Sequence, residues 1–247
     1  MLFRSLVANA PHMPVHLGSM GESVAAVKRA RGATMNPGDV YVLNAPYNGG
    51  THLPDVTVVR PVFDEPGKEI LFFVASRGHQ ADIGGTTPGS MPPDSRTVEE
   101  EGVLIDNFLL VDRGRFREAE LVELLRSGKY PARNPAQNVG DLKAQIAACE
   151  KGVQELHKMV GQFGLDVVRA YMRHVQDNAE EQVRRVLDVL KDGAFAYEMD
   201  DGSVIRVKVS VDRTSRTGIR RRSSSSSRTA TARLSATARR RRSARAP

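Results

Sequence analysis

Apolar residues recur at helical spacing in two long segments of the second half of the chain. In the first segment the spacings alternate between four and three residues, which is the pattern of one buried helix face. Its members are Leu142, Ile146, Cys149, Val153, Leu156 and Val160. The second stripe consists of Val168, Met172, Val175, Ala179, Val183, Val186 and Leu190. Because only a short glycine-bearing segment separates the two stripes, we expect an antiparallel helical hairpin.

Strand-forming residues cluster in two pairs of short runs. Residues 56–63 and 69–76 flank a five-residue loop, 64–68, which contains a Pro-Gly pair and predicts a β-hairpin. Residues 194–199 and 203–211 flank an Asp-Asp-Gly turn and predict a second one.

The first half of the chain adds a helix, a strand and two loops. A Ser-x-x-Glu capping box predicts a short helix over residues 20–31. A strand is expected at 40–43, followed by a glycine-bearing loop at 44–51, and residues 84–94 contain too much Gly and Pro for regular structure. The pattern therefore predicts an α+β fold: a β-hairpin and loop-rich region, a helical hairpin and a further β-hairpin.

Composition narrows the class of protein. The 247 residues are 40% hydrophobic, which is enough to form a core. A single cysteine, Cys149, excludes an internal disulfide, so we expect packing to hold the fold in a reducing, cytoplasmic setting. No apolar run approaches the roughly 20 residues of a membrane span, and prolines interrupt the opening segment before a signal-type hydrophobic region develops. We expect no membrane association.

The basic charge of the chain is confined to its end. The net charge is +7, but residues 213–247 hold 12 arginines and no acid, which leaves 24 basic against 29 acidic residues in 1–212. This Arg- and Ser-rich segment cannot bury enough apolar surface to fold, so we predict a disordered tail after one domain of 212 residues. Three interpretations of this tail are open: an arm that binds nucleic acid, a solvated tail without a partner, and the product of a frameshift. We favour the frameshift, because residues 213–247 contain no lysine and the strand pattern stops at Asp212. We therefore expect no nucleic-acid partner.

Candidate chemistry concentrates at the open end of the first predicted hairpin. His52 and Asp55 precede its first strand, and His79 and Asp82 follow its second, so one His-x-x-Asp spacing occurs at both ends. A turn at the centre of the loop pairs residues whose numbers sum to about 132, which makes His52 and His79 neighbours. Pro54 restricts the backbone in a way that lets Asp55 turn back toward His52.

Two imidazoles and one carboxylate at one point suit a divalent metal such as Zn, Mn or Fe. A site with three protein ligands leaves a coordination position open, where the metal polarises a carbonyl or lowers the pKa of a water to about 7. The alternative is that both histidines only hydrogen-bond to loop backbone.

Three blocks of sequence carry a resemblance to a known family. They are GDVYVLNAPYNGGTHLPDVTVVRPVF, SRGHQADIGGTTPGSMPPDS and PARNPAQNVGDLKAQIAACEKG, and HMPVHLGSM precedes them. In content and order these blocks resemble the hydantoinase B family. That family comprises the B subunits or halves of ATP-dependent hydantoinases and 5-oxoprolinases, with relatives among acetone and acetophenone carboxylases. The resemblance covers roughly residues 10–212.

The resemblance implies a division of labour between two proteins. In that family an A-type partner uses ATP to phosphorylate the carbonyl or enol oxygen of the substrate, and the B-type chain takes the activated intermediate onward. Lactam-type substrates are hydrolysed, and ketones are carboxylated. The metal site of the family uses histidines and acids, and His52, Asp55 and His79 occupy the matching positions. No ATP-binding motif occurs in this chain, in keeping with an ATP-using partner.

The resemblance also implies that this chain is a fragment. Family members are typically more than twice as long. Their N-terminal region, with an acidic residue that completes the metal site, and their C-terminal part are expected to lie beyond the two ends of this chain. We therefore expect a family domain truncated at both ends, whose own activity stays open.

Other residues have less defined roles. Asp82 is an alternative ligand or orients His79. His12 and His16 either line the pocket or have structural roles. The glycine-rich loop either admits and covers a substrate or only shapes the backbone. Its first residues are Gly84, Gly85 and Thr86.

The predicted function is metal-assisted ring opening of a cyclic amide, 5-oxoproline or a hydantoin, in a complex with an ATP-dependent A-type subunit. The rival within the family is a subunit of an ATP-dependent ketone carboxylase, whose product is a β-keto acid. A rival from another class is a non-catalytic chain whose basic tail binds nucleic acid.

Overall fold

The computed structural model of the protein describes residues 6–10, 13, 16–200, 202–212 and 231–239. The chain divides into two compact units, residues Met1–Arg169 and Ala170–Pro247. Helices and antiparallel strands both occur, so the predicted α+β class is confirmed. Within the described part of the chain, no helix combines the length and the apolar character needed to cross a lipid bilayer.

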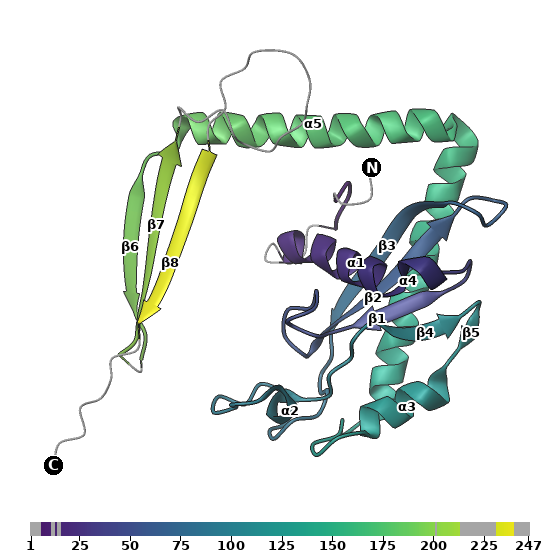
Figure 1. Ribbon diagram of the computed structural model, residues 1–247, viewed down its shortest axis with the longest axis horizontal. Coiled ribbons are helices and arrows are strands. Elements are labelled where there is room, and N and C mark those ends of the chain that lie inside the picture. The colour runs from purple at the N-terminus through teal and green to yellow at the C-terminus, as the bar shows by residue number, and fades with distance from the viewer. Residues whose placement is uncertain (1–5, 11–12, 14–15, 201, 213–230, 240–247) are drawn as a thin grey trace. The chain divides into compact units, whose positions relative to one another are not determined.

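The first unit is built on an antiparallel sheet of five strands in the order β3-β2-β1-β4-β5 (Figure 1). The strands are β1 (Val40–Leu43), β2 (Asp55–Phe63), β3 (Ile70–His79), β4 (Phe108–Asp112) and β5 (Arg115–Phe116). The predicted strand at 40–43 and the predicted first hairpin are confirmed. β3 extends three residues beyond its predicted end, to His79.

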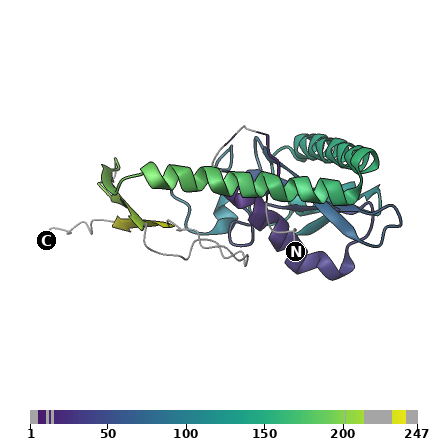
Figure 2. The same cartoon turned by 90° about the horizontal axis from the view of Figure 1, so that it is seen from above.

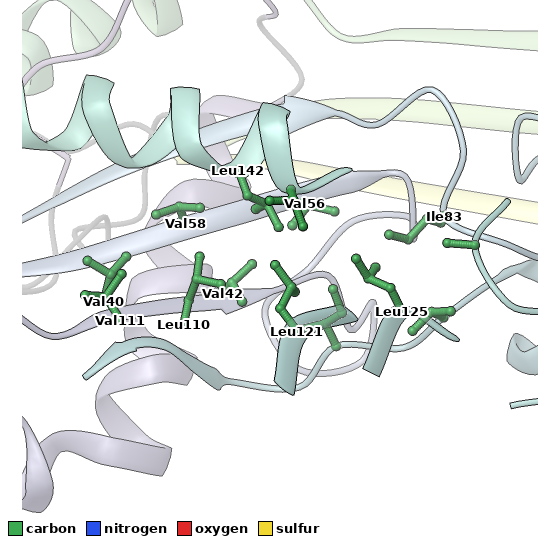
Figure 3. Close-up of a cluster of buried hydrophobic side chains, with 14 of the residues drawn as sticks. Val40, Val42, Val56, Val58, Ile83, Leu110, Val111, Leu121, Leu125 and Leu142 are labelled. Carbon is green, nitrogen blue, oxygen red and sulfur yellow. The ribbon is translucent and has the colours of Figure 1, made fainter. Parts of the chain in front are cut away.

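One face of this sheet is covered by α4 (Pro135–Phe163). Because side chains alternate along a strand, Val56 and Val58 of β2 point to this face. They join Leu142 of α4 in the larger hydrophobic cluster (Figure 3). α3 (Glu118–Arg126) completes this layer through Leu121, which belongs to the same cluster.

The opposite face of the sheet is covered by α1 (Leu17–Arg31). Val59 of β2 points to this side, where it forms a second buried cluster with Ala26 and Val27 of α1. Figures 1 and 2 show α1 (purple) and α4 (teal) on either side of the sheet. The intervening residues 95–134, for which the sequence pattern predicts no element, also contain the short α2 (Val98–Glu101).

The start of α1 differs from the predicted one. The helix begins at Leu17 with His16 at its N-cap, and the expected capping box at Ser19 is not formed. The Ser19 hydroxyl instead donates back to the carbonyl of His16 at 3.0 Å. This earlier start brings His16 to the edge of the sheet, where it takes part in the candidate site.

The long helix α4 confirms the first predicted stripe and extends it at both ends. It starts after Asn134, whose side chain accepts a hydrogen bond from the amide of Gln137, and Pro135 occupies the first turn. It ends before Gly164, whose φ of +81° lies in the left-handed region that glycine tolerates.

The second predicted stripe forms a helix. α5 (Leu165–Val189) has one buried residue, Val168. The stripe residues Val175, Val183 and Val186 are 48%, 59% and 53% exposed. The expected packing of the two stripes against each other in an antiparallel hairpin stays a prediction, because α5 continues past Arg169 into the second unit. The pattern identifies the apolar face of a helix and does not determine what covers that face.

The second unit contains a sheet in the order β6-β7-β8. β6 (Gly193–Glu198) and β7 (Val204–Asp212) confirm the second predicted hairpin. β8 (Thr231–Arg239) lies in the segment that the sequence predicts to be disordered, and it pairs with β7 over nine residues. This strand contains no Gly or Pro and meets an open strand edge. The rest of residues 213–247 lies outside the described part.

Candidate metal centre

The first hairpin places Asp55 and His79 directly opposite each other at its open end. The predicted register is therefore corrected by two residues, since Leu53 and not Asp55 was expected opposite His79. Two features contribute one residue each: the turn pairs Asp64 with Glu69 and Phe63 with Ile70, one residue from the expected pairing, and β3 contains a bulge. Val62 pairs with Phe72 and Phe63 with Ile70, which leaves one extra residue on β3 and shifts every pair nearer the open end.

His52 reaches the same point through a turn that leads into β2. The amide of Asp55 donates to the carbonyl of His52 at 3.0 Å, which closes a turn through Pro54. The Pro54 carbonyl also accepts from the amide of Gln80 at 2.8 Å, so the turn is tied to the end of β3. In this turn the His52 Nδ1 atom lies 3.1 Å from the Asp55 Oδ2 atom.

The three residues His52, Asp55 and His79 form a compact cluster. Each offers one ligand atom, and these atoms all lie within 4.8 Å of one another. His79 Nδ1 lies 3.0 Å from Asp55 Oδ1, and the two imidazole ring centres are 5.3 Å apart. The carboxylate is buried, with 5% of its side chain exposed, whereas the imidazoles of His52 and His79 are 37% and 55% exposed. The cluster therefore opens to solvent on its imidazole side.

These residues fit a divalent ion by donor type and by spacing. Neutral imidazole nitrogen and carboxylate oxygen are the ligands that Zn prefers alongside thiolate. In a tetrahedral site with bonds of about 2.1 Å, neighbouring ligand atoms are separated by about 3.4 Å. The His79 Nδ1 to Oδ1 distance of 3.0 Å and the His52 Nδ1 to Oδ2 distance of 3.1 Å are close to that separation, although they run to different oxygens of Asp55, and one ligand atom of each residue lies within 4.8 Å of the others.

Two further side chains contact the same carboxylate. His16, from the N-cap of α1, places its Nε2 atom 3.3 Å from Asp55 Oδ2. The Thr51 hydroxyl donates to the same oxygen at 3.3 Å. His16 lies outside the set of three residues whose ligand atoms are all mutually close. The structure therefore brings His16 into contact with the Asp55 carboxylate but not into the set of convergent ligand atoms. His12 lies outside the described residues.

Arg77 is a site residue that the sequence analysis missed. It lies two residues before His79 on β3, and the two side chains therefore share a face of the sheet. Arg77 contacts His16 and three hydroxyl groups of β2 and α1. Its burial lowers the pKa of the guanidinium, and the nearby charge of Asp55 opposes this shift. The alternation of β3 around His79 was the available signal for it.

A buried asparagine shapes the loop that carries His52. The Asn44 carboxamide donates to the carbonyls of Leu53 and Val103 at 2.9 Å each, and it accepts from the amide of Ile105 at 2.6 Å. A Cβ atom on Gly50 would lie 2.3 Å from the Asn44 carbonyl oxygen, so only glycine fits there. The loop at 44–51 is thus held by backbone contacts immediately before the ligand.

The other face of the hairpin end is clamped by α4. The buried Gln145 side chain donates to the carbonyl of Val56 on β2 and to that of Ser76 on β3, at 3.0 Å each. Gly78, next to His79, leaves room for this amide, because a Cβ atom there would approach it to 3.1 Å. Gln145 therefore joins the two strands that present Asp55 and His79.

Asp82 lies outside the cluster of His52, Asp55 and His79, and its hydrogen bonds connect the glycine-rich loop to Arg133. Its carboxylate accepts from the amides of Gly84 and Gly89 and from both the amide and the guanidinium of Arg133. Among the described residues, none of its hydrogen bonds goes to His79. Burial alone raises the pKa of Asp82, but the hydrogen bonds from Arg133 and the loop amides outweigh it and hold the pKa below the usual range.

The backbone groups of the glycine-rich loop after Asp82 form hydrogen bonds with residues outside the loop. Arg133 donates to the carbonyl of Gly85 at 2.8 Å, and the amide of Thr86 donates to Glu100 at 2.8 Å. Gly84 and Gly85 have φ angles of +94° and +88°, and a Cβ atom on Gly84 would lie 2.3 Å from the Tyr130 carbonyl. These glycines are therefore required for close backbone contact, whatever else the loop does.

The chain is similar in sequence to proteins of one family. The family model described as Hydantoinase B/oxoprolinase matches residues 3–244. The protein named 5-oxoprolinase 1 from Arabidopsis thaliana is 45% identical over 231 residues, which cover 84% of this chain and 18% of that protein. The chain thus spans about a fifth of the length of this relative.

Two solved structures share the fold. The ATP-dependent caprolactamase from Pseudomonas jessenii superposes with a TM-score of 0.71 at 28% identity, covering 83% of this chain and 36% of that chain. The nucleotide-free acetone carboxylase superposes with a TM-score of 0.68 at 18% identity, covering 81% of this chain and 28% of that chain. At that identity, the second likeness extends to the fold alone.

Proposed function

The chain belongs to the hydantoinase B/oxoprolinase family. From this membership we propose that it contributes a divalent-metal site to an ATP-dependent enzyme that opens a cyclic amide. The observation that carries the proposal is the cluster of His52, Asp55 and His79, in a chain 45% identical to a 5-oxoprolinase. The chain spans only part of such relatives, so the activity is proposed for the assembly that contains it.

The relatives favour a cyclic amide over a ketone as substrate. 5-Oxoproline and caprolactam, the compounds in the names of the more similar proteins, both contain an amide bond within a ring. The likeness to acetone carboxylase is at 18% identity and supports the fold only. We therefore assign ring opening by hydrolysis, with 5-oxoproline as the first substrate to test.

ATP use is proposed to reside in a partner. The caprolactamase relatives are described as ATP-dependent and as a subunit beta, which supports a division of the reaction between chains. An A-type partner that activates the amide oxygen with ATP would pass the activated ring to this chain.

The residues of this chain would hold the metal and receive the ring. Asp55 supplies a buried negative charge, and His52 and His79 supply neutral nitrogens on the solvent side. A divalent ion at this position supplies a Lewis acid that polarises an oxygen of the substrate and lowers the pKa of water. The exposed edges of the imidazoles leave that side accessible to a small molecule.

The proposal is tested with the full chain in complex with its A-type partner. We expect ATP-dependent formation of glutamate from 5-oxoproline, loss of turnover when EDTA removes the metal, and recovery on adding Zn, Mn or Fe. His52→Ala and His79→Ala each remove one imidazole ligand and leave the metal site incomplete. Each substitution should therefore lower turnover by about 100-fold or more. His157→Ala, an exposed histidine of α4, is the matched control and should leave turnover unchanged.

A parallel assay separates the rival chemistry. Incorporation of labelled bicarbonate into acetone, with no glutamate from 5-oxoproline, would identify a carboxylase and contradict the hydrolase assignment. Full turnover in His52→Ala or His79→Ala would contradict the role of the cluster itself.

A further inference from the structure

The Asp55 carboxylate is contacted by three histidines from different segments of the chain. His52 and His79 lie on the solvent side, where the three ligand atoms converge. His16 contacts Oδ2 from the direction of α1, at 3.3 Å, without joining the convergent set. The side chain of His16 is 23% exposed, which is less than the 37% of His52 and the 55% of His79. His16 therefore contacts the carboxylate from a less exposed position, outside the set of convergent ligand atoms.

The contact with Arg77 defines where His16 carries its proton. The Arg77 Nη1 atom lies 3.3 Å from His16 Nδ1. A guanidinium has N–H donors and no acceptor, so Nδ1 must be the bare nitrogen that accepts. The neutral ring then carries its proton on Nε2, the atom that faces Asp55. His16 is thus a hydrogen-bond donor to the carboxylate.

Arg77 is itself fixed by acceptors on two elements. Its Nε atom donates to the Thr57 hydroxyl at 2.8 Å, and Nη1 and Nη2 donate to Ser19 and Ser23 at 2.5 and 2.7 Å. The two serine hydroxyls donate in turn to the carbonyls of His16 and of Gly49. All these contacts are consistent with a single arrangement of protons, so the orientation of Arg77 has little freedom.

We propose that His16 is a positioning residue for the metal site. Held by Arg77 in the tautomer with the proton on Nε2, it donates to Asp55 Oδ2 and fixes the carboxylate in the orientation that binds the ion. This inference rests on the proposed function. Hydrogen-bond partners behind metal ligands contribute to affinity by holding the ligand in place, typically by 10- to 100-fold.

The tautomer is measured directly in the wild-type chain without metal. Long-range ¹H–¹⁵N correlation spectra of the imidazoles should show His16 with a bare Nδ1 and a protonated Nε2, with the signal assigned by its loss in His16→Gln. In Arg77→Met, which lacks the donor, this preference should be lost. A protonated Nδ1 on His16 in the wild-type chain overturns the proposal, and this readout does not depend on any variant folding.

Affinity is measured with Zn²⁺ as the probe, in competition with a chromophoric chelator. His16→Ala should weaken Zn²⁺ binding by about 10- to 100-fold. His16→Gln places an amide N–H near the position of Nε2 and should bind Zn²⁺ within about threefold of wild type. His157→Ala on α4 should bind as wild type does. Circular dichroism of each variant verifies the fold.

The outcomes separate this inference from the proposed function. If the wild-type chain binds Zn²⁺ and His16→Ala binds it equally well, the positioning role is overturned and the metal site stands. If the wild-type chain does not bind Zn²⁺, both proposals fall. Weak binding by His16→Ala with rescue by His16→Gln supports the donor role, because a side chain that only fills space would not be restored in this way.

Discussion

Asp82 offers a sharp test of whether its carboxylate holds the glycine-rich loop. We predict that Asp82→Asn, which keeps the size of the side chain and removes its charge, destabilises the first unit at pH 7. The measurement is the free energy of unfolding from urea titrations followed by circular dichroism. Amide hydrogen exchange of residues 84–89 reports the stability of the loop itself, and the exchange rate should be higher in the variant.

The magnitude follows from how the four donors are distributed. Oδ1 accepts from the amides of Gly84 and Arg133 at 3.0 and 3.1 Å, and Oδ2 accepts from the amide of Gly89 and the guanidinium of Arg133 at 3.2 and 2.6 Å. An asparagine keeps one oxygen, so in either orientation its NH₂ group faces two donors. Two charge-assisted hydrogen bonds contribute about 3–6 kcal/mol. Because 41% of the Arg133 side chain is exposed, we expect about 3 kcal/mol.

The effect depends on pH with a definite sign. The pKa of Asp82 is lowered in the folded chain, so its contribution is present above the unfolded pKa of about 4 and is lost as the pH falls through the folded value. The difference in stability between wild type and Asp82→Asn should therefore be largest near pH 7. It should shrink below about pH 4, as the wild-type carboxyl takes up its proton.

Asp94 provides the matched control. It is exposed in the same loop region, so Asp94→Asn should change stability by less than about 0.5 kcal/mol. A change of that small size in Asp82→Asn at pH 7, or an equal change at pH 7 and pH 3, would refute the assigned role. Zn²⁺ affinity should survive Asp82→Asn in the folded chain, because Asp82 does not contact His79.

Two further predictions concern packing. Burial raises the pKa of Cys149 to about 11, so a thiol reagent should modify it roughly 100-fold more slowly in the native chain than in urea, and equal rates would contradict its burial. Gly50→Ala forces a Cβ atom against the Asn44 carbonyl and should lower the melting temperature and the Zn²⁺ affinity together. Gly161→Ala in α4, where a Cβ atom meets nothing within 4 Å, should instead raise stability by about 0.5–1 kcal/mol, and a gain in both variants would contradict the close contact at Gly50.

Periodicity predicted the main elements because each is long enough for its pattern to repeat. The first hairpin, the α4 stripe and the strands at 193–212 are of this kind. The elements between residues 98 and 126 are two to nine residues long, which is too short for a pattern to repeat. The stripe of α5 was identified, but its exposure depends on tertiary contacts that no local pattern encodes.

The candidate site was predictable to the extent that it depends on one hairpin. His52, Asp55 and His79 converge because a short turn and a strand pair bring them together, and both features have sequence signatures. The register was wrong by two residues: the turn is centred half a residue later than expected, which shifts the pairing by one, and the bulge on β3, which has no marker such as a glycine, shifts it by another. His16 and Arg77 meet only because α1 crosses the sheet above β3, which is a contact between distant segments.

The bulge also determines where this hairpin tolerates changes of length. Between the Val62–Phe72 pair and the Asp55–His79 pair the ladder has no slip. One residue inserted into β3 within this stretch would transfer the His79 ring from the side of α1 to the side of α4, since successive side chains alternate. Residues added to the turn at 64–69 would leave both ligands where they are. Insertions and deletions in related chains are therefore expected at the tip of this hairpin and excluded from its arms.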